Sequence, residues 1–261
     1  MVGGVLLGVG ILALIYGFIG TVRDLKLLPD PDVFLPLGVP VGVFTITFAL
    51  VTIVLAASIL ARDRRRPDEQ NRRDYPFGIA LLLFGAIGWY AAFALAADKV
   101  QLALEPTAEL GCNVSLLVQC SANLESWQGS VFGFPNPLIG IAGWTAVFTV
   151  GCLVLSGIRL APWFWIAFTI GVAGALVFVV WLISQSIFVL GTLCPWCMVT
   201  WAVTIPLFWA VTLRGAKEGL FGARIMRAIG PAYSWVPLIT VASYLVVAVI
   251  AQLRLDVLSY L

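Results

Sequence analysis

The sequence predicts an all-α integral membrane protein, and three observations support this prediction. Hydrophobic residues make up 61% of the 261 residues, and charged residues make up only 11%. The mean hydropathy of +1.04 is well above what a soluble core of this length needs. Uncharged apolar runs of about 20 residues recur along the chain, whereas a membrane barrel would show short segments of alternating polarity. We therefore expect about seven transmembrane helices.

The first two predicted helices, Val2–Gly20 and Val33–Ala61, precede the Arg-rich segment RDRRRPDEQNRRDYP. The first lacks the basic start and the small-residue cleavage site of a secretory signal, so we interpret it as a retained helix. We expect residues 1–61 to form a two-helix membrane extension, and residues 62–76 to form a cytoplasmic linker.

Five further apolar runs follow the linker, and each is long enough to cross the hydrocarbon as a helix. Their predicted bounds are Pro76–Ala97, Asn136–Gly157, Pro162–Leu190, Pro195–Leu213 and Ser234–Ala251.

The distribution of Lys and Arg predicts the orientation in the membrane. With a cytoplasmic N-terminus, eleven of the 15 Lys and Arg fall in inside loops, and only Arg23, Lys26, Lys99 and Arg254 fall outside. Inside loops of membrane proteins carry such an excess. The net charge of +2 therefore reflects loop orientation, and no nucleic-acid partner is expected.

Four of the five cysteines are predicted to lie on the outer, oxidising side of the membrane. Cys112 and Cys120 fall in the long outside loop, and Cys194 and Cys197 fall at the outer end of the sixth helix. Cys152 lies inside the fourth helix, where a lone thiol behaves as a small apolar side chain. We assign no role to Cys152.

The unit CPWC, residues 194–197, has its own physical interpretation. Pro195 suits the first turn of a helix, because the N–H that proline lacks would have no helical partner there. Cys194 is then a candidate N-cap, and Cys197 lies one turn in. Free N–H groups and the helix dipole favour a thiolate at this position, so the pair is suited to cycling between dithiol and disulfide.

A metal half-site or an inert structural bridge also fits CPWC taken alone. Four external cysteines offer an all-thiolate zinc site, but Cys112 and Cys120 have seven residues between them, more than zinc pairs usually have. The chain contains no histidine, which excludes an imidazole base and a histidine haem ligand. We therefore expect no metal and no haem.

Three segments together resemble the vitamin K epoxide reductase family, in the form of its bacterial disulfide-forming members. They are CNVSLLVQC at Cys112–Cys120, GFPNPLIGIAGW at Gly133–Trp144 and CPWC opening a helix. The resemblance covers roughly residues 76–213. It implies a four-helix bundle around a quinone at residues 77–214, with the external loop 98–135. Residues 215–261 would then add a cytoplasmic loop and a last transmembrane helix.

The resemblance also implies an enzyme, a quinone-dependent thiol oxidoreductase of the inner (plasma) membrane. Cys112 would exchange with a thioredoxin-like extracytoplasmic protein, and Cys120 would relay to Cys194. Cys197 would attack a quinone of the menaquinone or vitamin K type. The chain ends at Leu261 soon after the last predicted helix, so we expect this partner to be a separate protein.

The family match gives Asn136 a role as hydrogen-bond donor to a quinone carbonyl, although its place before Pro137 also suits an N-cap. Trp201 stands where animal members carry a tyrosine. Trp196, Trp201 and Phe134 are candidates for an aromatic pocket, but packing and interface anchoring account for each equally well.

Two alternatives stay open from the sequence. One is reduction of vitamin K epoxide by the same cysteines, and the other is a non-catalytic membrane protein with structural disulfides. The segment SANLESWQGSVFGFP, residues 121–135, mixes apolar and polar residues, so we expect a short amphipathic stretch on the outer membrane face.

Overall fold

The computed structural model describes residues 69–158 and 160–257, and these residues are mainly helical. Extended pairing within these ranges amounts to one isolated bridge between Val118 and Leu193. The predicted all-α class is therefore confirmed. The predicted helices Val2–Gly20 and Val33–Ala61 lie outside the described residues, so the total of seven stays a prediction.

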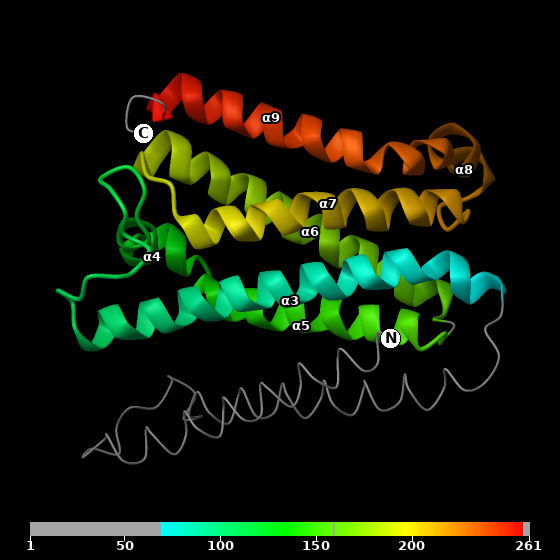
Figure 1. The fold of residues 1–261 in the computed structure, drawn as a ribbon, viewed down its shortest axis with the longest axis horizontal. Helices are drawn as coiled ribbons and strands as arrows, with labels where there is room; N and C mark the ends of the chain where they lie inside the picture. Colours follow the sequence, from blue (N-terminus) through cyan, green and yellow to red (C-terminus); the bar gives the residue numbers. More distant parts are fainter. Residues whose placement is uncertain (1–68, 159, 258–261) are drawn as a thin grey trace, which may run out of the picture. The chain divides into compact units, whose positions relative to one another are not determined.

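Five helices in the described part of the chain are long and apolar enough to cross a membrane. The main helices, labelled in Figure 1, are α3 (Glu69–Leu104), α5 (Asn136–Leu155), α6 (Pro162–Gln185), α7 (Pro195–Lys217) and α9 (Val236–Leu255). A π-helical turn, η2 (Ser186–Leu190), extends α6. Shorter elements complete the connections: α4 (Ser121–Glu125), η1 (Trp127–Ser130), α8 (Ala223–Ile229) and η3 (Gly230–Trp235).

Proline lies in the first turn of four of these helices, including Pro137 in α5, because a missing N–H costs nothing there. Pro162 and Pro195 begin α6 and α7, and Pro237 lies in the first turn of α9. The expected beginnings of the helices at Pro162 and Pro195 are therefore correct.

The first described helix contains the predicted span Pro76–Ala97 and extends beyond it at both ends. Helix α3 begins at Glu69, so Pro76 lies inside it, and it continues past Ala97 to Leu104. Charge at Asp98 and Lys99 suggested an end, but a helix need not stop where the apolar run stops. The Lys99 ammonium donates to the carbonyl oxygen of Leu124 at 2.6 Å, which gives this charge a partner outside the helix.

The chain divides into two compact units, each described by itself. One contains Met1–Gly78 and Cys152–Ile158, and the other contains Ile79–Gly151 and Arg159–Leu261. In the first unit, Cys152 is a free, fully buried thiol. Its carbonyl oxygen accepts a hydrogen bond from Ser156 Oγ at 2.8 Å. All contacts described below lie within the second unit.

Close helix contacts in the second unit depend on small residues. A Cβ added to Gly85 of α3 would lie 2.8 Å from Phe148 Cα of α5, and one added to Gly88 would overlap the Trp144 ring. Helices in a membrane gain most of their association from such close approach. Helix α7 packs against both α6 and α9. Trp209 Nε1 of α7 donates to Ser243 Oγ of α9 at 3.1 Å.

Candidate active site

The four cysteines predicted to be external meet beside α4 at one end of the second unit. Cys112 and Cys120 form a disulfide, whereas Cys194 and Cys197 are free thiols. Cys194 Sγ lies 3.5 Å from Cys120 Sγ, although 74 residues separate them in the sequence. The two pairs are therefore in direct contact through Cys120 and Cys194.

A tight turn brings the two ends of CNVSLLVQC together. The backbone N–H of Val114 donates to the carbonyl oxygen of Val118 at 2.8 Å. Asn113 then fixes the end of the turn, because its Oδ1 accepts from the N–H of Cys120 at 2.9 Å and from that of Ser121 at 3.3 Å. Its Nδ2 donates to Ser121 Oγ at 2.6 Å. Sequence reasoning missed Asn113, although an amide beside a cysteine is a common turn residue.

A short backbone pairing places this turn against the segment that leads into α7. The N–H of Gln119 donates to the carbonyl oxygen of Leu193 at 3.0 Å, and the N–H of Leu193 donates to that of Leu117 at 2.8 Å. The bridge is parallel, so both chain segments run in the same direction and reach Cys120 and Cys194 at the same end of it. Gly191 makes the preceding bend at φ 67°, which glycine adopts without strain. Backbone register therefore sets the contact between the two sulfurs.

The CPWC unit has the helix-capping geometry that the sequence predicts. Cys194 is the N-cap of α7, Pro195 lies in the first turn, and Cys194 Sγ accepts from the N–H of Cys197 at 3.3 Å. A side-chain hydrogen bond from Cys197 lowers the pKa of Cys194, and the N–H groups of Cys197 and Trp196 lower it further. Burial opposes this change. The lowered pKa makes the Cys194 thiolate a better leaving group in thiol–disulfide exchange than that of an ordinary cysteine.

The sulfurs are shielded from water by apolar side chains. Cys120 and Cys194 are fully buried, and Cys112 is 7% exposed. Together with these cysteines, Leu95, Leu102, Leu110 and Leu124 form one apolar cluster. Cys197 packs against this cluster and also against a second one that contains Trp201. The chain of sulfurs therefore runs from a nearly buried loop cysteine into the helix bundle.

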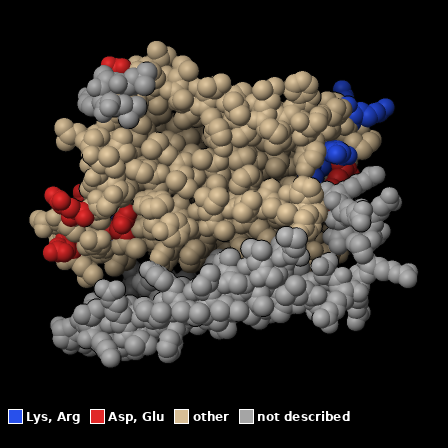
Figure 2. All heavy atoms as spheres, viewed as in Figure 1, with Lys and Arg blue, Asp and Glu red and all other residues tan. Residues whose placement is uncertain are grey.

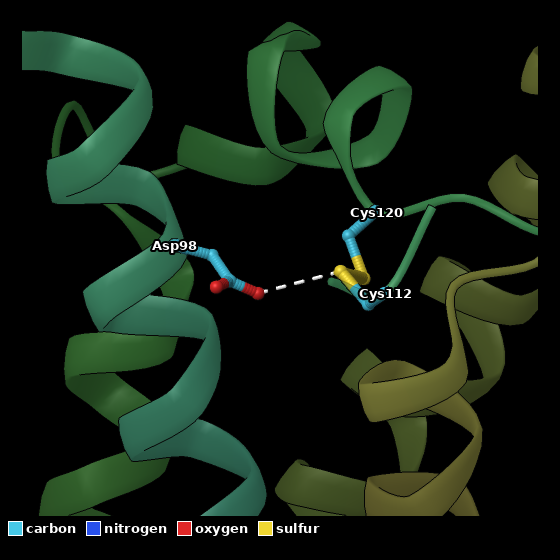
Figure 3. Close-up of side chains that lie close together, drawn as sticks. All are labelled: Asp98, Cys112 and Cys120. Carbon is cyan, nitrogen blue, oxygen red and sulfur yellow. Dashed lines mark hydrogen bonds between the residues drawn. A yellow bond between two sulfur atoms is a disulfide. The ribbon is translucent and has the colours of Figure 1, made fainter. Parts of the chain in front are cut away.

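A carboxyl group adjoins the loop disulfide. Asp98 Oδ2 of α3 lies 3.4 Å from Cys112 Sγ (Figure 3). Ligand atoms of Asp98, Cys112 and Cys120 lie within 4.8 Å of one another, but the disulfide uses both sulfurs and leaves no thiolate to ligate a metal in this form. Sequence reasoning missed Asp98 because the predicted helix ended at Ala97. The available signal was an acidic residue in the last turns of an apolar run.

Asn136 begins α5, and its amide bonds back into the preceding loop. Its Nδ2 donates to the carbonyl oxygen of Gln128 at 2.6 Å, and its Oδ1 accepts from the N–H of Val131 at 3.1 Å. These bonds hold η1 against the start of α5. The amide nitrogen has two hydrogens, so one remains for a ligand.

The three candidate aromatic residues lie in different packing environments. Trp196 meets Tyr90 of α3 edge to face, with ring centroids 5.5 Å apart, and packs on the cluster that holds the sulfurs. Trp201 is buried in the cluster between α6 and α9. Phe134 is 45% exposed, and its ring centroid lies 6.4 Å from that of Phe132. Trp196 is therefore the candidate nearest to the cysteines.

The segment predicted to be amphipathic forms α4 and η1. Leu124 and Gln128 are buried, whereas Trp127, Phe132 and Phe134 are exposed. Asn123 ties α4 to the end of α6 and to the approach to CPWC. Its Nδ2 donates to Thr192 Oγ1 at 3.0 Å, and its Oδ1 accepts from Ser186 Oγ at 3.0 Å. These hydrogen bonds thus hold α4 against the backbone that leads to Cys194.

Comparison with known proteins agrees with this arrangement. The model of the vitamin K epoxide reductase family matches residues 79–212, just over half of the chain. The chain belongs to the vitamin K epoxide reductase family. It is therefore a membrane oxidoreductase, and quinones and vitamin K are the substrates of this family. Both cysteine pairs lie within the matched residues. A search of curated proteins gave no match.

Proposed function

We propose that this member of the vitamin K epoxide reductase family reduces a menaquinone-like quinone and passes oxidising equivalents to an extracytoplasmic thioredoxin-like protein. The product is a disulfide in that protein, so the reaction supports disulfide formation outside the cytoplasm. Cys112, Cys120, Cys194 and Cys197 carry the electrons in this proposal.

The 3.5 Å contact between Cys120 Sγ and Cys194 Sγ is the observation that supports the proposal most directly. In the relay, a thiolate of Cys120 attacks Cys194 in a Cys194–Cys197 disulfide, and Cys197 leaves as a thiolate. Cys112 then attacks Cys120, which releases Cys194 and leaves the Cys112–Cys120 disulfide. An oxidised loop pair beside two free CPWC thiols is the redox state that this step produces.

The CPWC pair supplies the electrons for the quinone. Its two thiols give up two electrons and two protons, which convert a quinone into a quinol and leave a Cys194–Cys197 disulfide. Cys197 packs against both apolar clusters, so its sulfur is suited to meet a lipid-soluble ring. We assign Asn136 as a donor to the quinone carbonyl through its remaining N–H, and Trp196 as the first candidate for contact with the ring.

The proposed orientation of the protein in the membrane rests on the distribution of its charged residues. On the face shown in Figure 2, Asp and Glu gather mainly at the end that carries α4, while the visible Lys and Arg lie at the opposite end beside α8. The excess of basic residues at the α8 end fits a cytoplasmic location. We therefore place the cysteines outside and the N-terminus inside, with residues 77–214 as the catalytic core and residues 1–61 as an added membrane extension.

A turnover assay tests this function. Purified protein would be given dithiothreitol or a reduced thioredoxin-like protein, together with a menaquinone analogue, and formation of quinol would be followed by absorbance. We expect turnover with both donors in the unaltered chain, and loss of turnover with the protein donor in Cys112→Ala. Reduction of vitamin K epoxide without reduction of the quinone would favour the alternative substrate. Absence of both reactions would contradict an enzymatic role.

A further inference from the structure

Asp98 is a partly buried residue that contacts the loop disulfide, and the relay described above gives it no role. It lies on α3, 14 residues before Cys112, and the fold brings its Oδ2 to 3.4 Å from Cys112 Sγ. Its side chain is partly buried, and it points from α3 toward the disulfide (Figure 3). This contact involves a reacting atom of the proposed exchange.

The chemistry of the contact depends on the redox state of Cys112. A disulfide sulfur carries no hydrogen, so this contact is a hydrogen bond in the oxidised form only when the carboxyl group donates the proton. After reduction, the Cys112 thiol donates to a carboxylate instead. A single proton therefore forms this hydrogen bond in both redox states. The Asp98 carboxyl group holds the proton in the oxidised form, and the Cys112 sulfur holds it in the reduced form.

We propose that Asp98 is the proton store of the loop pair, holding a proton beside the disulfide and giving it to Cys112 when that sulfur leaves as a thiolate. This inference rests on the proposed function, because it assumes that the loop disulfide exchanges with a dithiol. It goes further by assigning a proton-transfer role to a residue outside the cysteine motifs.

The exchange balances with Asp98 included. A donor thiolate attacks Cys112 Sγ, a bond forms between these sulfurs, and Cys120 leaves as a thiolate that takes up one of the two protons released by the donor dithiol. The second donor thiolate then attacks the donor's own sulfur in the mixed disulfide. Cys112 leaves and receives the proton of Asp98. The donor dithiol loses two protons and two electrons, and one proton is released overall.

Within residues 69–158 and 160–257, few other ionisable groups face Asp98. Cys112 and Cys120 lie on the loop, and Cys194 at the start of α7 is close enough for the charge of Asp98 to act on it. Cys197 is the next thiol beyond Cys194. Lys99 is adjacent on α3, but its ammonium donates to the carbonyl oxygen of Leu124. Asp98 is therefore the carboxyl group that contacts the loop disulfide directly.

The test measures how the equilibrium between the loop disulfide and a dithiothreitol buffer depends on pH. The full chain would be equilibrated between about pH 5.5 and 7.5, where ordinary thiols stay protonated. Differential alkylation and mass spectrometry would then give the reduced fraction of Cys112 and Cys120. Release of up to one proton makes the equilibrium constant for reduction rise with pH, by at most about tenfold per pH unit.

We expect the equilibrium constant for reduction to rise with pH in the unaltered chain and to stay level in Asp98→Asn. Glu109→Gln is the matched control, because it removes an exposed carboxylate three residues before Cys112 and should keep the rise. A level profile in the unaltered chain would overturn the proposal without any variant, and so would equal slopes in the unaltered and Asp98→Asn chains. The assay contains no quinone and no protein partner, so its result is independent of whether the proposed turnover occurs.

Discussion

Replacing Asn113 with alanine should loosen the loop that brings Cys120 to Cys194. The substitution removes three hydrogen bonds, at 2.9, 3.3 and 2.6 Å. Two of these are exposed and contribute little, but the N–H of the fully buried Cys120 loses its acceptor. A buried donor without a partner costs about 1–3 kcal/mol, so we expect the docked loop to lose about 2 kcal/mol.

Hydrogen exchange gives a measure of this loss at amides that do not contact Asn113. The N–H groups of Gln119 and Leu193 bond across the bridge between the loop and the CPWC approach. A loss of about 2 kcal/mol corresponds to about 30-fold faster exchange at both, when exchange follows the opening equilibrium. Ser121→Ala is the control, because it removes only the exposed 2.6 Å bond. Unchanged exchange at Gln119 and Leu193 in Asn113→Ala would refute the role of Asn113 in setting the register.

Three further predictions concern the thiols and the orientation. Cys197→Ser should abolish quinone reduction with the protein still inserted, while Cys152→Ser should keep its activity; turnover assays with detergent-solubilised protein check both, and the reverse pattern would contradict the assignment. Because hydrogen bonding from Cys197 lowers the pKa of Cys194, alkylation of Cys194 by iodoacetamide should reach half its maximal rate at a lower pH than for an ordinary thiol. In Cys197→Ala the profile should move to higher pH, and an unmoved profile would show that this bond is not the cause. In a chain without its own cysteines, a new cysteine at Glu125 should react with an impermeant maleimide on intact cells, and one at Arg227 should not; labelling at Arg227 alone would invert the topology.

Local rules in the sequence were enough to predict several parts of the site. The capping role of Cys194 follows from a proline directly after it and from the apolar helix beyond it. The start of α5 at Asn136 likewise follows from the proline that comes next. Such features depend on neighbours within one helical turn, so a single sequence contains them.

Contacts between distant segments could not be read in the same way. Asp98 reaches Cys112 only because α3 continues past its apolar run, and the sequence shows no reason for that continuation beyond adequate helix formers. Residue types and spacing alone do not bring Cys120 to Cys194, and only the family resemblance implied their relay. The contact depends on a bridge between residues 118 and 193. The amide of Asn136 was expected to serve α5 or a quinone, yet its bonds run to the loop carbonyl of Gln128 and the N–H of Val131.

The direct test of the relay is capture of its intermediate, a disulfide between Cys120 and Cys194. The double variant Cys112→Ser with Cys197→Ser keeps these two sulfurs, which lie 3.5 Å apart, and removes the partner of each. Mild oxidation should join them, and peptide mass spectrometry should detect the link. The matched variant Cys112→Ser with Cys194→Ser, which keeps Cys120 and Cys197, should form its link more slowly. Absence of a Cys120–Cys194 disulfide, under conditions that oxidise Cys112 and Cys120 in the unaltered chain, would contradict electron transfer by this route.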